Sequence, residues 1–322
     1  MHLLIDNYGA KLEVEDEKFK ISCEENVRYV SAMKLLSINI LKPCVLTTPA
    51  IALAARNQVP LLVYNKVGKV EACIWSHSYG NIADIRARQA FYCQSDAAIA
   101  WIRQLLQLKQ EGQLQNLTWL ADRVRAAATT INSHIANIKD LKPMLKKADT
   151  KEGLRALEAQ ASKRYWEALC TALQHYVAIP GRVKKGATDP FNISINYLYG
   201  ILYGHTEASL IRAGLDPYMG LLHINRHQRP VLAYDHIEPF RHWADRVAAT
   251  LFMHGFHSPR NFGLGEKQTM ELTGEGKRML ITSFFAFLEQ RSYLNGRRIK
   301  NRDHIQYLSS SLVATLKKFP II

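Results

Sequence analysis

Apolar residues follow two different spacings along this chain. In residues 1–78 they form short β-branched or aromatic runs, separated by turn-forming segments such as 7–9 and 65–68. These runs predict strands at His2–Ile5, Phe19–Cys23, Leu36–Ile40, Cys44–Thr47, Pro60–Tyr64 and Val70–Ile74. Thr48-Pro49 followed by AIALAAR predicts one short helix between the strands, because proline is favoured in the first turn of a helix.

From Ala83 onward the apolar residues recur at helical spacing. The pattern predicts helices at Arg88–Leu108, Leu117–Ile138, Asp149–His175, Asn192–Ala213, Arg241–Phe256, Gly274–Gln290 and His304–Lys318. The third helix should start at a cap, Asp149-x-x-Glu152. The fourth lacks a polar face, so we expect it at the centre of the helical part. Residues 140–148 and 296–302 are predicted to be a lysine-rich connection and a basic turn.

The two spacings together predict the fold class, α+β, with a small N-terminal β-rich domain followed by a larger all-helical C-terminal domain. We place the β-rich domain at 1–80, a linker at 81–90 and the helical domain at 91–322. A chain of 322 residues is long for a single core, which agrees with two domains.

The basic residues are unevenly distributed between these parts. Residues 1–85 carry nine Lys or Arg and nine Asp or Glu, so the whole net charge of +14 lies in the remainder. This asymmetry predicts that the second part binds a polyanion, first of all nucleic acid. An anionic membrane surface is the weaker candidate, because no basic amphipathic anchor is present.

The remaining bulk features predict a cytoplasmic protein. The five cysteines include no Cys-x-x-Cys pair, which argues against a zinc knuckle or a disulfide framework and for a reducing compartment. No uncharged apolar run reaches about 18 residues, so no transmembrane helix is predicted. The N-terminus lacks the basic start and apolar core of a signal peptide.

Residues 214–241 bring one imidazole and two carboxylates into a short unit. His223 follows a tight loop, Asp235 ends an apolar run that starts at Val231, and a helix starting after Asp235 would place Glu238 on its first turn. Such nitrogen and oxygen ligands suit a divalent cation such as Mg²⁺ or Mn²⁺. Asp235-x-x-Glu238 equally fits a capping box, and His223 equally fits a partly buried histidine with satisfied hydrogen bonds. Both interpretations stay open at this point.

Glu158 is a further candidate, because it lies beside the predicted buried stripe of the third helix, one turn after Leu154. A surface glutamate would more usually face away from that stripe. The alternative is a solvated helix charge that pairs with Ser162 or Arg155.

Several common catalytic motifs are absent from the sequence. There is no P-loop, no His-Glu-x-x-His and no Gly-x-Ser-x-Gly, so a P-loop ATPase, a zincin protease and an α/β-hydrolase are not supported. His205-Thr206-Glu207 matches part of a deaminase motif, but the required Pro-Cys-x-x-Cys is missing.

Five motifs in consistent order resemble the CRISPR-associated protein 1 family of spacer-acquisition integrases. They are Leu157-Glu158 with Tyr165-Trp166, Asp189-Pro190-Phe191-Asn192 with Asn196-Tyr197, Ala213-Gly214-Leu215-Asp216-Pro217, Gly220-Leu221-Leu222-His223, and Asp235-His236-Ile237-Glu238-Pro239-Phe240-Arg241. The resemblance covers most of the chain, including VPLLVYNKVGKVEA in the β-rich part. The chain departs from the family in the turn 224–230, which lacks the usual glycine, and at His236, where an apolar residue is more usual.

The resemblance implies a metal-dependent DNA integrase and endonuclease of CRISPR adaptation. Such a protein joins the 3′-hydroxyl ends of a prespacer to repeat DNA by transesterification. The resemblance assigns catalytic and metal-binding roles in the helical domain to Glu158, His223 and Glu238, with Asp235 as a further candidate ligand and Mg²⁺ or Mn²⁺ as the cofactor. Whether His223 is a ligand or a general acid stays open.

The resemblance also implies partners. These are DNA, both as prespacer duplex and as CRISPR repeat, a second copy of the chain bound through the β-rich domain, and CRISPR-associated protein 2. Phosphate contacts are expected from Lys146, Lys147, Arg182, Lys184, Lys185, Arg241, Arg297 and Arg298. Two other functions stay open: a non-catalytic DNA-binding scaffold with the same fold, and a metal-dependent repair nuclease acting on branched DNA.

Overall fold

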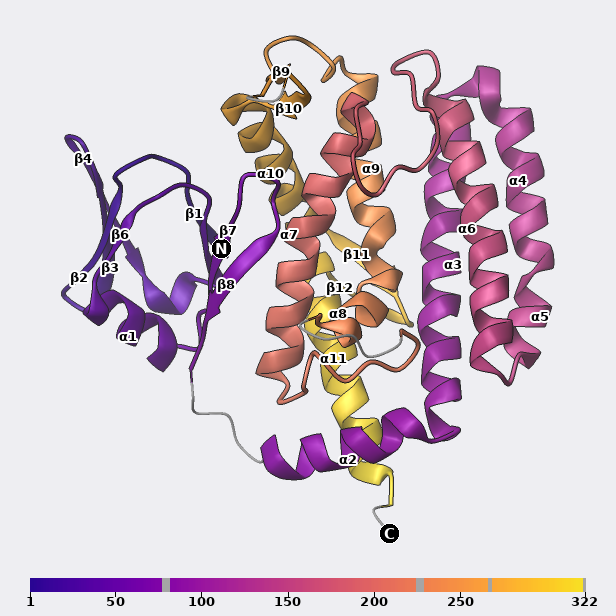
Figure 1. The fold of residues 1–322 in the computed structure, drawn as a ribbon, viewed down its shortest axis with the longest axis horizontal. Helices are drawn as coiled ribbons and strands as arrows, with labels where there is room; N and C mark the ends of the chain where they lie inside the picture. Colours follow the sequence, from indigo (N-terminus) through magenta and orange to yellow (C-terminus); the bar gives the residue numbers. More distant parts are fainter. Residues whose placement is uncertain (77–81, 224–228, 266–267, 321–322) are drawn as a thin grey trace.

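A computed structural model describes residues 1–76, 82–223, 229–265 and 268–320. Its elements confirm the predicted α+β class, because strands dominate up to Ile74 and helices dominate from Ile82 onward (Figure 1). None of the helices in these four ranges is long and apolar enough to cross a membrane.

Two four-stranded sheets make up the first part of the chain. The sheet β1-β5-β7-β8 contains β1 (His2–Ile5), β5 (Ser37–Ile40), β7 (Leu61–Tyr64) and β8 (Val70–Ile74), and only the β7–β8 pair is antiparallel. The sheet β4-β3-β2-β6 contains β4 (Asn26–Ser31), β3 (Lys18–Cys23), β2 (Lys11–Glu15) and β6 (Val45–Leu46). A short 3-10 turn η1 (Ala32–Lys34) and the helix α1 (Thr48–Arg56) complete this part.

Strands β2 and β4 are absent from the sequence prediction. Their burial patterns explain the omission, since Leu12 is the one fully buried residue of β2 and Val30 the one fully buried residue of β4. Strands that expose most of their side chains carry little hydrophobic signal. Leu12, Val30 and Phe19 of β3 nevertheless join one core with Ile38 and Leu61 of the other sheet.

The second part of the chain is built from ten α-helices within the described ranges. They are α2 (Ile82–Gln94), α3 (Ala97–Arg123), α4 (Ala128–Asp140), α5 (Lys142–Lys147), α6 (Lys151–Leu173), α7 (Pro190–Arg212), α8 (Val231–His236), α9 (Arg241–Met253), α10 (Gly274–Glu289) and α11 (Asn301–Lys318). Two 3-10 turns, η2 (Arg125–Ala127) and η3 (Glu238–Phe240), and two hairpins, β9–β10 (Phe262–Leu264, Met270–Leu272) and β11–β12 (Arg291–Leu294, Arg297–Lys300), lie between them.

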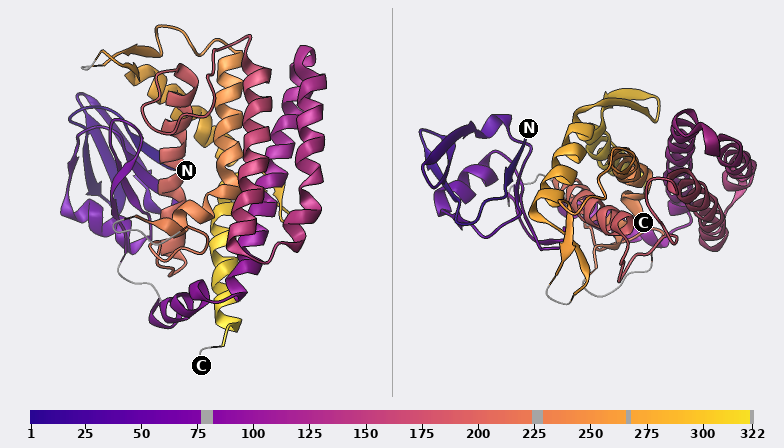
Figure 2. Two further views of the ribbon diagram at one scale, coloured as in Figure 1. Left: turned by 45° about the vertical axis from the view of Figure 1, so that its right-hand side comes forward. Right: turned by 90° about the horizontal axis from the view of Figure 1, so that it is seen from above.

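Seen from above, the molecule has three groups of elements (Figure 2). The β-rich part lies on one side, α7 with α9–α11 forms the middle, and α3–α6 form the other side. Fourteen residues of α7 are buried, which confirms its predicted central position. Residues 82–90 of the predicted linker belong to α2, and residues 77–81, which carry most of the predicted composition break, lie outside the described ranges.

Three sequence expectations are wrong in detail. The predicted helices at Arg88–Leu108 and Leu117–Ile138 are regrouped, because breaks at Ser95-Asp96 and at η2 make α3 a single helix that overlaps both. The connection 140–148 contains α5, which buries Leu145. The cap of α6 is Thr150 instead of Asp149, because the Thr150 side chain accepts a hydrogen bond from the Gly153 N–H.

The β-rich part packs closely against α7 through two glycines one turn apart. A Cβ on Gly200 would lie 2.2 Å from the carbonyl oxygen of Gly68, and a Cβ on Gly204 would lie 2.3 Å from a methyl group of Val70. Only glycine allows the β7–β8 turn to approach the helix so closely. This contact brings the β-rich part to the edge of the cleft described next.

Candidate functional site

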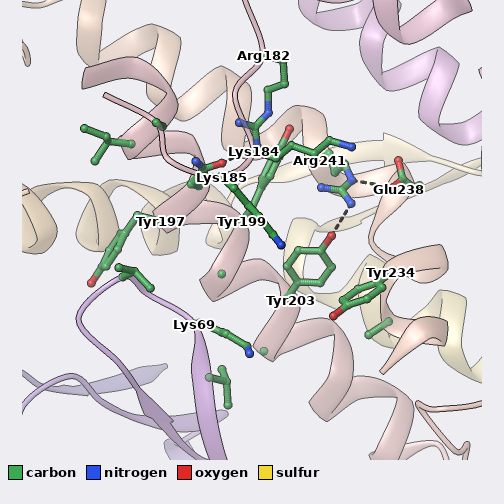
Figure 3. A pocket seen from close by; sticks show the side chains of 18 of the residues that line it. Lys69, Arg182, Lys184, Lys185, Tyr197, Tyr199, Tyr203, Tyr234, Glu238 and Arg241 are labelled. Atoms are coloured by element: carbon green, nitrogen blue, oxygen red, sulfur yellow. Dashed lines mark hydrogen bonds and ion pairs between the residues drawn. The ribbon is translucent and has the colours of Figure 1, made fainter. Parts of the chain in front are cut away.

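One cleft in the described part of the chain collects most of the predicted site residues. It has a volume of about 2170 Å³ and is bordered by α6, α7, α8, the segment 179–187 and the β7–β8 turn. Glu158, His223 and Glu238 all line it, although they come from three separate segments. Figure 3 shows Glu238 and Arg241 next to each other, with Tyr199 and Tyr203 of α7 beside Arg241.

Glu158 and Glu238 approach each other through a shared cation. Glu158 lies on α6, and its Oε1 atom accepts hydrogen bonds from Lys109 Nζ and from Ser162 Oγ, the latter at 2.8 Å. Glu238 begins η3, and its Oε2 atom lies 2.5 Å from the same Lys109 nitrogen. The structure therefore brings these two predicted residues together. Glu158 does pair with Ser162, as the alternative interpretation expects, but it also pairs with Lys109 and only 28% of its side chain is exposed.

The charge of Glu238 is stabilised from two sides. Burial opposes the charged form of Glu238, but the positive charges of Arg241 and Lys109 outweigh it and lower its pKa to about 2. Arg241 donates from Nε to Glu238 Oε1 at 2.9 Å and from its terminal nitrogen to the Tyr203 hydroxyl, at 2.5 Å. Its guanidinium also stacks on Tyr199. Arg241, expected to contact phosphate, is thus already engaged by groups of the protein.

His223 is held by Asp235. Asp235 Oδ1 lies 2.5 Å from His223 Nδ1 and accepts the backbone N–H of His223 at 3.0 Å, while Oδ2 accepts the N–H groups of Leu221 and Leu222. The capping interpretation is therefore wrong for Asp235, which lies in the last turn of α8 and is not at a helix start. The Asp235 side chain is fully buried, whereas 46% of the His223 side chain is exposed. Asp235 orients His223 and does not line the cleft itself.

Two long side chains that the sequence analysis did not select connect these parts. Arg155, one turn before Glu158 on α6, donates a hydrogen bond to the carbonyl oxygen of Leu222. It therefore ties the helix of Glu158 to the loop of His223. Lys109 lies on α3, at positions i+3 and i+4 from the buried residues Leu106 and Leu105. A lysine on the apolar stripe of a predicted helix is the signal that could have identified it.

The fit to a divalent cation rests on the two carboxylates. Glu238 Oε2 is buried and accepts no well-directed hydrogen bond, although the Lys109 ammonium lies against it. A positive charge thus already occupies the space between two hard oxygen donors, the ligand type that Mg²⁺ and Mn²⁺ prefer. Among the described residues, no three His, Cys, Asp or Glu side chains are close enough together to form a ready-made metal site. His223 would have to approach the two carboxylates to complete the predicted set.

The predicted phosphate-binding residues fall into two groups. Arg182, Lys184, Lys185 and Arg241 line the cleft, and Lys69, which was not predicted, lines it from the β-rich part (Figure 3). Arg182 is fixed by hydrogen bonds to Asn192 and Asn196. The remaining four residues do not line this cleft, since they lie on α5 (Lys146, Lys147) and on β12 (Arg297, Arg298). The cleft also contains basic residues that the sequence analysis did not select, namely Lys66, Lys69, Lys109, Arg155, Lys163, Arg229 and Lys277.

The sequence departs from the family pattern at His236 and in the turn 224–230, and the structure describes only the first of these fully. His236 is fully buried and its Nε2 atom contacts Ser309 Oγ at 3.2 Å, so a polar residue is accommodated by a polar partner on α11. Burial lowers the pKa of His236 to about 3, which keeps the ring neutral. Most of the turn 224–230 lies outside the described residues.

A β-rich part followed by a helical part, with two carboxylates and a histidine in a basic cleft, agrees with the architecture that the sequence motifs predict. The family model for CRISPR associated protein Cas1 matches residues 3–285. The chain therefore belongs to the Cas1 family.

Individual relatives cover nearly the whole chain. The CRISPR-associated endonuclease Cas1 1 of Archaeoglobus fulgidus is 26% identical, over 98% of this chain and 96% of its own length. The structure of a casposase bound to integration product has a TM-score of 0.82 at 20% identity, covering 99% of this chain and 92% of that one. The structure of a Cas6-RT-Cas1–Cas2 complex has a TM-score of 0.79 at 20% identity, and the match covers 98% of this chain and 35% of that one. These two likenesses establish the shared fold.

Proposed function

We propose that this protein is a metal-dependent DNA integrase and endonuclease of CRISPR adaptation. It joins the 3′-hydroxyl ends of a prespacer duplex to CRISPR repeat DNA. The observation that carries the proposal is the pairing of Glu158 and Glu238 around one positive charge, inside a basic cleft of a Cas1-family protein. Two related proteins, an endonuclease and a casposase bound to integration product, support the same chemistry.

The reaction is a transesterification. The oxygen of a DNA 3′-hydroxyl attacks a phosphorus atom of the repeat, a new P–O bond forms, and the bond to the departing 3′-oxygen breaks. The attacking hydroxyl loses one proton and the departing oxygen gains one, so one phosphodiester replaces another without an energy source. The same site releases a cut strand when water replaces the 3′-hydroxyl, which is the endonuclease activity.

Each site residue has a role in this scheme. Glu158, Glu238 and His223 would hold the Mg²⁺ or Mn²⁺ ion. When bound, the ion supplies charge stabilisation at the phosphoryl oxygens. His223 has a second candidate role, which is to donate the proton to the departing oxygen. Asp235 engages Nδ1, which leaves Nε2 for this role, and 46% of the side chain is exposed. Asp235 and Arg155 fix the loop that carries His223.

The cleft supplies the DNA contacts. Lys184 and Lys185 line one wall and Lys69 the opposite one, so a strand that crosses the cleft has positive charge on both sides (Figure 3). Lys146 and Lys147 on α5 and Arg297 and Arg298 on β12 would bind phosphates outside the cleft. Such contacts bind phosphates without reading sequence, so affinity falls steeply with salt.

We also propose the assembly and the compartment. The β-rich domain, residues 1–80, pairs with a second copy, and the helical domain, 91–322, carries the chemistry. Exposed apolar side chains on and beside β4, among them Tyr29 and Met33, support a partner surface there. CRISPR-associated protein 2 is the proposed companion, in agreement with the Cas1–Cas2 name of one related complex. The five unpaired cysteines support a reducing cytoplasm.

The testing experiment uses the full chain, a short duplex and a supercoiled plasmid that carries a CRISPR repeat. We expect joined duplex–plasmid product with Mg²⁺ or Mn²⁺, and none with EDTA or with a 3′-dideoxy duplex. The companion protein should raise the yield at the repeat. Cut plasmid without joined strands in every condition would favour the repair nuclease, and bound but unchanged DNA would favour the scaffold.

A further inference from the structure

Lys109 places a positive charge inside the carboxylate pair. It projects from α3, an element separate from α6 and η3, and its ammonium group contacts both Glu158 Oε1 and Glu238 Oε2. Only 11% of the Lys109 side chain is exposed, and that exposed part lines the cleft. A buried lysine between two carboxylates of a proposed metal site occupies the position where a cation is needed.

The electrostatic balance explains why the charge is there. Burial favours the neutral form of Lys109, but the negative charges of Glu238 and Glu158 outweigh it and raise its pKa, so the ammonium is charged. Without a cation between them, the two carboxylates would repel each other. The Lys109 ammonium therefore holds them close together in the metal-free protein.

Each carboxylate has a partner besides Lys109. Lys109 donates a hydrogen bond to Glu158 Oε1, and its nitrogen lies 2.5 Å from Glu238 Oε2. Glu238 has a second, better-directed partner in Arg241. Glu158 keeps Ser162 as a partner and has 28% of its side chain exposed to the cleft, so an ion from solvent can reach it. Both carboxylates would thus remain supported if the ammonium left.

We propose that Lys109 is a resident counter-ion that holds Glu158 and Glu238 ready, and that a divalent cation enters the site by displacing its ammonium group. The proposal rests on the metal site of the proposed function and adds a regulatory property to it. The flexible four-carbon stem of lysine allows the ammonium to withdraw while its base stays packed on α3. The divalent cation therefore competes with the Lys109 ammonium for the two carboxylates. The metal affinity is lower than it would be without Lys109, and occupancy depends on metal concentration.

The main experiment measures Mn²⁺ binding without DNA, using the electron paramagnetic resonance signal of free Mn²⁺. The full-length wild type is compared with Lys109→Met, which keeps the stem and removes the charge, and Lys109→Arg, which keeps the charge. We expect Lys109→Met to bind Mn²⁺ about tenfold more tightly than the wild type, which is about 1.4 kcal/mol. Lys109→Arg should bind no more tightly than the wild type.

The thermal midpoint gives a second readout. In EDTA, Lys109→Met should unfold at a lower temperature than the wild type, and saturating Mn²⁺ should restore most of the difference. Unchanged or weaker Mn²⁺ binding by Lys109→Met would overturn the proposal.

A measurement on the unmodified chain covers the case in which Lys109→Met does not fold. Limited lysine acylation, followed by mass spectrometry of the peptide that contains Lys109, reports whether the ammonium is free. We expect labelling of Lys109 to be slow in EDTA and to rise at least severalfold with Mn²⁺. The labelling of Lys317, on the distant end of α11, should not change. Equal labelling with and without Mn²⁺ would overturn displacement.

Glu158→Gln separates this proposal from the proposed function. If Mn²⁺ binds the wild type and binds Glu158→Gln more weakly, the proposed metal site is supported. The Lys109 variants alone then decide whether Lys109 is a counter-ion. If Mn²⁺ binds neither the wild type nor Lys109→Met, both proposals fail.

Discussion

Asp235 contacts His223 at both its backbone and its ring: Oδ1 accepts the backbone N–H at 3.0 Å and lies 2.5 Å from Nδ1. A carboxylate on Nδ1 leaves Nε2 as the ring atom that can act in the cleft, either towards a cation or as a proton donor. The buried Asp235 therefore fixes the position of the exposed His223 side chain.

Asp235→Asn tests this orientation. The amide cannot accept from three N–H groups and hold the ring nitrogen as the carboxylate does, so we expect strand joining to slow by roughly 10- to 100-fold. DNA affinity should stay within about twofold, because Asp235 does not line the cleft. Single-turnover joining and filter binding on the same preparations measure the two effects. A joining rate equal to that of the wild type would mean that His223 needs no orientation.

Arg155 should behave as a positioning residue. Arg155→Met removes the hydrogen bond to the Leu222 carbonyl and so loosens the loop of His223 from the helix of Glu158. We expect slower joining at saturating DNA, by roughly tenfold for a displacement of this kind. Arg164→Met is the matched control, since Arg164 lies on the same helix, pairs with the surface residue Glu167 and does not line the cleft. Equal effects of the two variants would contradict the assigned role.

Lys184 and Lys185 should contribute to DNA affinity through charge alone. We expect Lys184→Ala with Lys185→Ala to weaken binding similarly for all sequences and to reduce the slope of log affinity against log salt by about 2. Lys317→Ala with Lys318→Ala removes the same charge from the exposed end of α11 and is the control. Fluorescence anisotropy over a range of salt concentrations measures the slope. An unchanged slope in the cleft variant would place the DNA path elsewhere.

The buried carboxyl of Asp245 should make stability depend on pH. Burial raises the pKa of Asp245 to about 6, although hydrogen bonds from the Tyr199 and Tyr165 hydroxyls favour its charged form. Its ordinary pKa is 3.8, so the protonated group stabilises the fold at low pH. That contribution is lost as the pH rises through about 6, and it amounts to on the order of 3 kcal/mol.

Asp245→Asn removes this titration. The free energy of unfolding of the variant, relative to the wild type, should therefore rise between pH 4 and pH 6 and be level above pH 7. Urea denaturation at a series of pH values measures the difference. A difference that stays constant across this range would mean that Asp245 keeps an ordinary pKa in the folded protein.

The sequence predicts those features of the fold that depend on local patterns. Val70–Ile74 and the buried helix around Tyr199 follow from short β-branched runs and from a helix without a polar face. The hairpin β11–β12 could also have been predicted, because Asn-Gly at 295–296 is a strong sequence signal for a two-residue hairpin turn. Both residues have the positive φ that this turn requires. The prediction of a plain basic turn there overlooked this signal.

The site itself is only partly accessible from sequence. Glu158, His223 and Glu238 lie in recognisable motifs, and the structure places all three on one cleft. Lys109 and Arg155 act across elements that are distant in the chain, so no local pattern assigns their partners. Asp235 shows the opposite problem: its spacing to Glu238 matches a cap, but the fold of α8 directs it to the loop of His223 instead.

The most direct test of the account compares DNA joining and DNA binding in Glu158→Ala and His223→Ala. These two residues are suitable because their side chains are partly exposed. Loss of the buried Glu238 would instead take from Arg241 its only carboxylate partner among the described residues, and from Lys109 one of two, at a cost of about 3–5 kcal/mol of stability. The account predicts that either substitution abolishes joining of a 3′-hydroxyl duplex to repeat DNA, with the dissociation constant for DNA within about twofold of the wild type. Joining that persists in both variants, or that falls only in step with DNA binding, would contradict it.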